Sequence, residues 1–368
     1  MRPVAVIAIT RNGAQLGSKI AGGLAGSKLY VLRKYHGAAT CKALPFDELR
    51  SQIESCWHDG NDLVCIMATG IVVRILAPLL EAKDSDPAVV VMDDAAKFSI
   101  SLLSGHLGGA NELAERCAWL TGARAVITTA TDVNNLPSFD MLARENDWGI
   151  DEIQRVKSLN SLLLDHRSIA VVDPTGRTRT WFHGKGNLAF FETIDAALGS
   201  GASGFVFVTN RHLPLKLMPE TLLILRPKTL VLGIGCNSGT SADEIEQFVS
   251  AQLRRILLST KSIRLVASAS AKENEAGLIE FAKRMGAELV FFPSSQLNRI
   301  KTPTPPSQQV LSAIGANGVA EPAAILASGG GRLLLKKVKS DNVTLAIAEF
   351  SADNCVDLLR DYSEGNHR

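Results

Sequence analysis

The chain has 368 residues, and its 39 Lys and Arg against 37 Asp and Glu give a formal net charge of +2. Hydrophobic residues make up 46% and charged residues 21%, the balance of a soluble globular protein, and the length predicts two or three domains. Basic residues are scattered, and the densest group, Lys336, Lys337 and Lys339, is typical of a solvated strand end. This distribution argues against a nucleic-acid partner.

The cysteines and the apolar runs exclude several other classes. Six cysteines show neither a CxxC pair nor clustered spacing, which argues against a zinc site and a disulfide framework. The apolar stretch at 4–9 is too short for the core of a signal peptide, so we expect a cytoplasmic protein. The run 63–80 nears the length of a membrane span, with Arg74 as its only charge. Its pattern predicts instead a strand, a turn and an amphipathic helix, so we expect no membrane association.

Short β-rich runs alternate with helical patterns from residue 3 to residue 135, which is typical of an α/β domain. We predict strands in this part at 4–10, 28–32, 63–67, 88–92, 98–103 and 125–129. Between two of these runs, the sequence Asp93-Asp94-Ala95-Ala96 indicates a hairpin turn. We therefore interpret its two acids as turn formers rather than as a catalytic pair.

The segment 101–113 leaves a predicted strand, passes through a glycine-rich loop and enters a helix. Gly105, Gly108 and Gly109 would let the backbone approach a ligand, and the helix start offers unpaired amides to a carboxylate or phosphate. His106 lies in this loop, where an imidazole can exchange a proton near neutral pH. The alternative is a tight connection whose histidine only caps neighbouring backbone groups.

The predicted strand at 125–129 continues into two polar residues, Thr131 and Asp132. Parallel α/β sheets place ligands at the carboxyl ends of their strands, so these residues are candidate companions of His106. For Asp132 the alternative is an ordinary helix cap or turn residue.

Two further glycine-rich segments, 10–17 and 233–241, also follow predicted strands. Neither has a Walker ending or the full GxGxxG spacing, so both are weak nucleotide signals. As anion cradles at helix starts they suit a substrate with several carboxylates. Cys236 has no histidine near it in the sequence, and we interpret it as a small buried residue rather than a nucleophile.

Regular signals weaken between residues 140 and 226 and then resume. In the weak part we predict a helix at 152–165 and strands at 169–172, 178–182, 188–191 and 205–208. In the last part we predict strands at 230–234, 263–266 and 288–292, with helices at 241–257 and 272–285. Ser241 and Glu244 have the spacing of a capping box. The proline-rich segment 298–307 predicts an irregular loop.

The predicted fold class is therefore α/β, with two doubly wound α/β domains that flank a smaller α+β middle domain. The predicted ranges are 1–140 for the N-terminal domain with its Ser-Gly-His-Leu-Gly-Gly loop, 141–227 for the middle domain, 228–351 for the C-terminal domain and 352–368 for a polar tail.

Several of these motifs together resemble the CbiG family of cobalt-precorrin-5A hydrolases. In the N-terminal part they are Gly70-Ile71-Val72-Val73-Arg74, the stretch 103–112 and the stretch 127–132. In the C-terminal part they are Gly233-Ile234-Gly235-Cys236, Lys272 with Glu275, and Val319-Ala320-Glu321. The resemblance covers most of residues 1–350 and is weakest in the middle. Two departures are Asn237-Ser238, where the family usually has basic residues, and Pro322 in a run that is usually alanine-rich.

The resemblance implies a step of anaerobic cobalamin biosynthesis. A δ-lactone on the ring A acetate is opened, and the meso carbon leaves with its methyl as acetaldehyde, giving cobalt-precorrin-5B. The cobalt arrives in the substrate, so no cofactor and no protein metal site are expected. The expected partners are the cobalt-precorrin substrate, neighbouring cobalamin-pathway enzymes and a second copy of the chain. The alternatives are a non-catalytic tetrapyrrole carrier and a corrinoid methyltransferase, which would need a nucleotide-type glycine loop.

The residues are fitted to this chemistry as follows. His106 is the expected general base and Asp132 its orienting partner or a second acid/base, and the amides of Gly108 and Gly109 are expected to donate to an oxyanion or carboxylate. The full set of expected substrate-binding residues is Ser104, Gly105, Gly108, Gly109, Asn111, Thr131, Gly235, Lys272 and Glu321.

Overall fold

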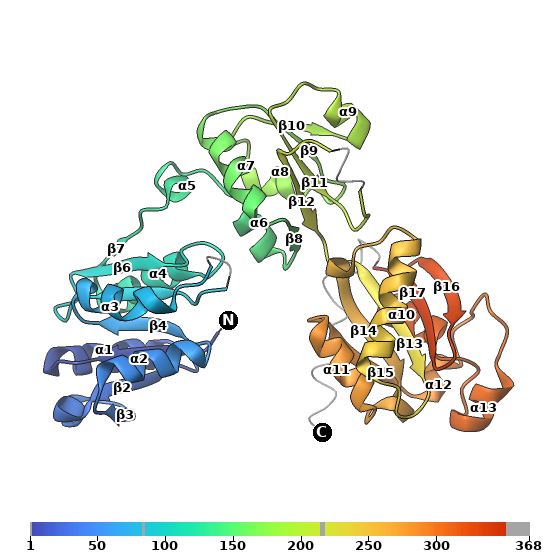
Figure 1. Cartoon of the computed structure of the whole chain (residues 1–368), viewed down its shortest axis with the longest axis horizontal. Helices are drawn as coiled ribbons and strands as arrows, with labels where there is room; N and C mark the ends of the chain where they lie inside the picture. The colour runs from blue at the N-terminus through green and yellow to red at the C-terminus, as the bar shows by residue number, and fades with distance from the viewer. Residues whose placement is uncertain (1, 83–84, 214–217, 351–368) are drawn as a thin grey trace. The chain divides into compact units, whose positions relative to one another are not determined.

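The computed structural model describes residues 2–82, 85–213 and 218–350, which form three sheets (Figure 1). The predicted helix and tail after residue 351 lie outside the described residues. Residue contacts divide the chain into two compact units, Met1–Arg144 and Glu145–Arg368. The first unit holds one sheet and the second holds two. The four predicted domain ranges stay a prediction.

The sheet of the first unit has seven strands in the order β3-β2-β1-β4-β5-β6-β7. Its strands are β1 (Val4–Ala8), β2 (Lys28–Leu32), β3 (Ala43–Phe46), β4 (Asp62–Ile66), β5 (Val89–Met92), β6 (Phe98–Leu103) and β7 (Arg124–Val126). Strands β1 to β5 pair in parallel, whereas β6 pairs antiparallel to β5 and parallel to β7. The carboxyl ends of β6 and β7 therefore lie at the opposite edge of the sheet from those of the other five strands.

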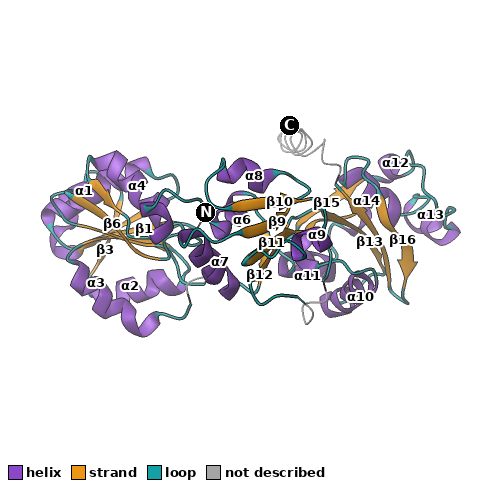
Figure 2. Ribbon diagram, turned by 90° about the horizontal axis from the view of Figure 1, so that it is seen from above, coloured by secondary structure: helices purple, strands orange, loops and turns teal. Residues whose placement is uncertain are grey.

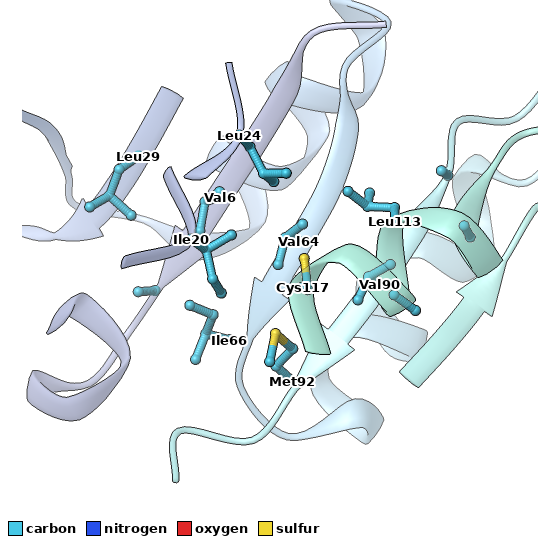
Figure 3. Close-up of a cluster of buried hydrophobic side chains, with 14 of the residues drawn as sticks. Val6, Ile20, Leu24, Leu29, Val64, Ile66, Val90, Met92, Leu113 and Cys117 are labelled. Atoms are coloured by element: carbon cyan, nitrogen blue, oxygen red, sulfur yellow. The ribbon is translucent and has the colours of Figure 1, made fainter. Parts of the chain in front are cut away.

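Helices cover both faces of this sheet (Figure 2). Helices α1 (Arg11–Gly23) and α4 (Ala110–Thr121) lie on one face, and α2 (Leu49–His58) and α3 (Thr69–Leu76) on the other. The remaining helical segments are α5 (Ala130–Val133), α6 (Phe139–Glu145) and the short 3-10 turns η1 (Arg33–Ala38) and η2 (Ala77–Leu79). Side chains alternate along each strand: Val64 packs with residues of α1 and α4 (Figure 3), and Leu63 with residues of α2 and α3. The predicted doubly wound arrangement is confirmed for this unit.

The apolar run 63–80 divides as predicted into β4, α3 and η2. On α3, Val72, Ile75 and Leu76 are buried and Arg74 is exposed, the pattern of an amphipathic surface helix. Among the described residues, none of the helices combines the length and the hydropathy that a membrane crossing requires.

The middle sheet has five strands in the order β10-β9-β11-β12-β8, all parallel except β8. Its strands are β8 (Gly149–Asp151), β9 (Ile169–Val172), β10 (Leu188–Phe191), β11 (Gly204–Val208) and β12 (Leu222–Arg226), with helices α7 (Gln154–Leu164), α8 (Arg177–Phe182) and α9 (Ile194–Leu198). The strand predicted at 178–182 is wrong, because this segment forms α8. The Asp173 carboxylate accepts the N–H of Thr178 at 2.7 Å, which fixes a first helical turn.

The C-terminal sheet has the order β15-β14-β13-β17-β16, with β13 to β15 parallel and the last two strands antiparallel. Its strands are β13 (Leu230–Cys236), β14 (Ile263–Ala269), β15 (Glu288–Phe292), β16 (Leu333–Lys339) and β17 (Val343–Glu349). The helical segments are α10 (Ala242–Arg255), η4 (Thr260–Ser262), η5 (Ser270–Lys272), α11 (Ala276–Arg284), α12 (Ser294–Leu297), α13 (Gln308–Ile314) and α14 (Ala320–Ala327).

Both faces of the C-terminal sheet are covered, as predicted. Residues of α10 and α11 pack on one face, and α14 packs on the other. Gly233 lets α14 approach the sheet, because a Cβ there would lie 1.8 Å from the Ala320 carbonyl oxygen. The α/β class, with two doubly wound parts flanking a smaller middle part, is confirmed.

A buried ion pair holds the middle sheet to its edge strand. Arg226 of β12 is fully buried and donates to the Asp151 carboxylate of β8 at 2.6 and 2.9 Å. Lys261 of η4, which precedes the C-terminal sheet's β14, lies 3.2 Å from the same carboxylate. Within the second unit, one carboxylate therefore connects the middle and C-terminal sheets.

The cysteines differ strongly in burial. Cys65 of β4 and Cys117 of α4 are fully buried, and burial raises the pKa of each thiol to about 12. Cys41 is exposed. Cys236 is half-buried and burial raises the pKa of its thiol, in keeping with a small packed residue rather than a nucleophile.

Candidate functional site

The glycine-rich loop after β6 is a tight turn in which two glycines leave no space for a side chain. A Cβ at Gly105 would lie 2.8 Å from Asn111 Oδ1, and one at Gly108 would lie 2.3 Å from Ser104 Cβ. Gly109 has φ +88°, a conformation that favours glycine. The Ser104 and Gly105 carbonyls accept the N–H groups of the first two residues of α4, both at 3.1 Å. The loop is therefore closed onto the start of the helix that follows it.

His106 projects from this loop between two carboxylates. Its Nδ1 lies 3.0 Å from Asp140 Oδ2, and its Nε2 lies 2.7 Å from Asp132 Oδ2. The Thr131 hydroxyl lies 3.2 Å from Nε2. The side chain of His106 is 13% exposed, that of Asp140 7% and that of Asp132 43%. The histidine thus connects a buried carboxylate with an exposed one.

The surroundings favour the charged form of this histidine. Burial alone would lower the pKa of His106, but hydrogen bonds and charge from Asp140 and then Asp132 outweigh it and raise the pKa above its usual value. A histidine with a raised pKa carries its proton to higher pH.

Asn111 of α4 holds Asp132 in place. Its Nδ2 donates to Asp132 Oδ2 and to Thr129 Oγ1, each at 2.9 Å. Its Oδ1 accepts the Ser101 hydroxyl at 2.7 Å, which fixes which side of the amide faces Asp132. The exposed carboxylate therefore receives hydrogen bonds from both His106 and Asn111.

Helix α6 supplies two residues that the sequence reasoning missed. Asp140 and Arg144 are four residues apart and so lie on one face of the helix. Arg144 Nη1 donates to the His106 carbonyl at 2.9 Å, and its other nitrogen pairs with Glu112 of α4. The sequence signal for these residues is an acid and a base four positions apart on one helix face. No local pattern connects that pair with the His106 loop, which lies more than thirty residues earlier.

The structure brings together eight of the predicted residues in the first unit. These are Ser104, Gly105, His106, Gly108, Gly109, Asn111, Thr131 and Asp132. Two details differ from expectation. Asp132 lies in α5 rather than at a strand end, since β7 already ends at Val126. The Gly109 amide, expected to face a substrate oxygen, donates to the His106 carbonyl at 2.9 Å.

The other predicted residues lie in the second unit, and the charge of Lys272 is paired there. Its Nζ lies 2.9 Å from Glu275 Oε1. The same carboxylate accepts the Ser238 hydroxyl at 2.6 Å and the Gly239 N–H at 3.1 Å. Hydrogen bonds from Ser238 and Lys272 hold the pKa of Glu275 at about 2. Ser238, at one of the positions where basic residues are usual, thus closes its loop onto Glu275.

Glu321 has a structural position that argues against substrate binding. It is 2% exposed, and its oxygens accept the Thr304 N–H at 3.1 Å, the Thr304 hydroxyl at 2.7 Å and the Lys337 N–H at 2.9 Å. This buried carboxylate holds the proline-rich loop against α14 and β16. Gly235 is a packing position too, because a Cβ there would lie 2.6 Å from Thr344 Oγ1.

The glycine-rich segment 10–17 forms the start of α1 and lies apart from His106. Thr10 caps this helix by accepting the Gly13 N–H at 2.9 Å, and its hydroxyl donates to Asp94 Oδ2 at 3.1 Å. It follows β1, whose carboxyl end is at the opposite edge of the sheet from the His106 loop. The predicted hairpin turn at Asp93 and Asp94 is confirmed by the antiparallel pairing of β5 and β6.

Comparison with known proteins gives matches along most of the chain. Family models described as cobalamin synthesis G N-terminal, cobalamin biosynthesis central region and cobalamin synthesis G C-terminus match residues 51–132, 137–227 and 230–348. A protein of Priestia megaterium named cobalt-precorrin-5A hydrolase is 35% identical over 355 residues, 94% of each chain.

Two further relatives extend this result. A Salmonella typhimurium protein, also named cobalt-precorrin-5A hydrolase, is 33% identical over 306 residues, 83% of this chain and 86% of that protein. Protein CobE of a Sinorhizobium species is 32% identical over 123 residues, 32% of this chain and 79% of that protein. With these identities and three successive family regions, the chain belongs to the cobalamin synthesis G, or CbiG, family.

Proposed function

We propose that this protein is a hydrolase that converts cobalt-precorrin-5A, as its relatives are named to do. The observation that carries the proposal is the identity of 35% along 94% of both chains with a protein of that name. The match runs through all three family regions, so it is not confined to one shared domain.

The proposed reaction breaks two bonds. Water adds across the acyl–oxygen bond of the ring A lactone, which gives a carboxylic acid and an alcohol. The alcohol then loses its proton, and the carbon–carbon bond to the macrocycle breaks as acetaldehyde forms. The electron pair of that bond stays on the macrocycle, which takes up a proton. The reaction therefore needs a group that removes protons and a group that returns them.

The array around His106 supports such proton transfer. The Asp132 carboxylate is exposed, and its Oδ2 lies 2.7 Å from His106 Nε2. A proton can therefore move between these two atoms along one short hydrogen bond. We propose that this pair serves both steps. Ser104, Gly105, Gly108, Asn111 and Thr131 shape and hold the array. Lys272 remains a proposal for substrate contact, whereas Gly235 is withdrawn as a packing position and Glu321 because it is buried and engaged within the protein.

No cofactor is included in this proposal. The cobalt is part of the substrate, and both proposed bond changes are hydrolytic or proton-coupled, so neither consumes a reductant, an oxidant or a methyl donor. A corrinoid methyltransferase would instead consume one methyl donor for each turnover.

The decisive experiment incubates the purified chain with cobalt-precorrin-5A in buffer without added cofactors and measures acetaldehyde. We expect stoichiometric acetaldehyde release, and His106→Ala as the matched control should release it far more slowly. A carrier would bind the corrinoid, visible in its absorption spectrum, with no acetaldehyde formed. Binding without release by the folded wild-type protein would therefore favour the carrier over the enzyme.

A further inference from the structure

We propose that Asp140 is a positioning residue that holds His106 with both ring nitrogens protonated, and that Asp132 is the group that takes the proton from water. This inference rests on the proposed function, and it reverses the roles expected from the sequence, in which His106 was the base.

The two contacts of the His106 ring require two hydrogens. An ionised carboxylate only accepts hydrogen bonds, so a hydrogen bond between the ring and either carboxylate needs an N–H on the ring nitrogen. His106 faces Asp140 with Nδ1 at 3.0 Å and Asp132 with Nε2 at 2.7 Å. A neutral imidazole has a single N–H and satisfies one of them. Both contacts are met together when the ring is an imidazolium between two carboxylates.

The two carboxylates beside His106 differ in burial. The Asp140 side chain is 7% exposed and that of Asp132 is 43% exposed. A buried carboxylate is stable only beside a positive charge or strong donors, so Asp140 favours the charged ring. Asp132 can meet water and substrate, whereas Asp140 lies at the inner end of the array. The exposed carboxylate is therefore the one placed to accept a proton from outside.

Both ring nitrogens of His106 already face a carboxylate. A general base needs a free lone pair directed at the water it activates. Nε2 is occupied by Asp132 Oδ2 at 2.7 Å, with the Thr131 hydroxyl also at 3.2 Å. Nδ1 faces the buried Asp140. Because each ring nitrogen faces a carboxylate, His106 acts through Asp132 by setting its charge and orientation.

Two further charged side chains lie beside the His106 loop and pair with each other. Arg144 of α6 bonds the His106 carbonyl and pairs with Glu112 of α4, so these two side chains balance each other. Asp132 is on α5 and Asp140 is on α6. Two carboxylates and one imidazolium together carry one net negative charge. Asp132 is the exposed carboxylate of this group and is therefore suited to take a proton from water.

The first test follows the ring of His106 directly and needs no substrate. Nitrogen-15 NMR of the full chain, with His106→Gln to identify its signal among seven histidines, reports the protonation of both nitrogens. We expect two protonated nitrogens at pH 7, and a fall in the His106 pKa by about one unit or more in Asp140→Asn. Glu145→Gln, which removes the same charge from an exposed site on the same helix, should leave it unchanged. A ring with one protonated nitrogen at pH 7 would overturn the proposal.

The second test uses the pH dependence of acetaldehyde release. In the wild type, loss of the imidazolium proton should produce a fall in kcat at alkaline pH, and Asp140→Asn should move that fall to lower pH. Asp140→Glu should restore part of the shift, because it keeps the charge. A rate that drops in Asp140→Asn with an unmoved pH profile would indicate a merely structural role. If the wild type released no acetaldehyde, the proposed function would fail while the NMR result would still stand.

Discussion

At the scale of single residues, the His106 array explains what the sequence could and could not predict. His106 and Asp132 stand in distinctive stretches that follow two predicted strands, so both were identified as candidates. Asp140 was not, because a lone acid in a weakly patterned segment has no local signal and its contact with His106 spans 34 residues of sequence. Its role arises from the packing of α6, which periodicity alone does not specify.

The paired action of His106 and Asp132 can be tested by a double-variant cycle. Asp132→Asn should lower acetaldehyde release by on the order of a hundredfold, the usual size of a lost proton-transfer group, and His106→Ala should also be slow because it removes the charge that holds Asp132 in place. Because the two residues act as a unit, the double variant should be little slower than the slower single variant. Steady-state kinetics with circular dichroism as the folding control measures this. Additive losses would mean that the residues act independently.

The raised pKa of His106 also makes stability depend on pH. The folded state holds this proton more tightly than the unfolded chain, whose histidine pKa is about 6.5, so the stabilisation is full below that pH. It is lost as pH rises through the higher folded-state pKa. Urea unfolding should therefore show a stability advantage of wild type over His106→Gln that shrinks from pH 6 to pH 9. An advantage that grew with pH would contradict the charged ring.

At the scale of elements, the periodicity of hydrophobic residues predicted most of the helices and strands. Several of the errors have local causes. The segment 178–182 has β-branched and aromatic residues and was predicted as a strand, yet it forms α8, in whose first turn the Thr178 N–H donates to the Asp173 carboxylate. The strands that were not predicted are β3, β8, β12, β16 and β17, of which β3 has only four residues and includes Pro45. The reversal of β6 was predicted from the hairpin turn at Asp93 and Asp94 and not from periodicity, since an alternating pattern carries no direction. That reversal decides which loops share an edge with His106.

The start of α10 offers a test of an element that the sequence predicted correctly. Ser241 Oγ accepts the Glu244 N–H at 3.2 Å, which confirms half of the predicted capping box. The Glu244 carboxylate instead accepts from Asn342 at 3.0 Å. Ser241→Ala should lower the free energy of unfolding by about 1 kcal/mol. Ser250→Ala, inside the same helix, is the control and should be neutral or slightly stabilising in denaturant titrations.

At the scale of the whole molecule, composition and element rhythm predicted an α/β chain with a smaller middle part, but not how its parts group. Contacts assign the middle and C-terminal sheets to one unit, in which the Asp151 carboxylate bonds Arg226 and Lys261. A buried arginine inside β12 has no sequence pattern that names its partner, because the pairing joins residues 75 positions apart.

Limited proteolysis can test the predicted domain ranges. We expect the earliest cuts at 146–148, the turn between α6 and β8, next to where the two contact-defined units meet in the sequence. Cuts near 226–229 should come later, because the Asp151 carboxylate bonds both Arg226 of β12 and Lys261 of η4 within the second unit. Fragments identified by mass spectrometry would give this order. Rapid cutting within 60–130 would contradict the boundaries.

The alkylation rates of buried cysteines in the first unit can report how often this unit opens. Only the thiolate reacts with alkylating reagents, and Cys65 and Cys117 combine full burial with a pKa of about 12. Exposed Cys41 should be modified at once, whereas Cys117 waits until α4 leaves one face of the sheet and Cys65 until α2 and α3 leave the other. When both faces open in one event, the two rates are equal. If reclosing is faster than alkylation, their common modification rate divided by that of Cys41 approximates the equilibrium constant for opening this unit in the native protein. The amino acids that make its core thus also report how often that core is lost.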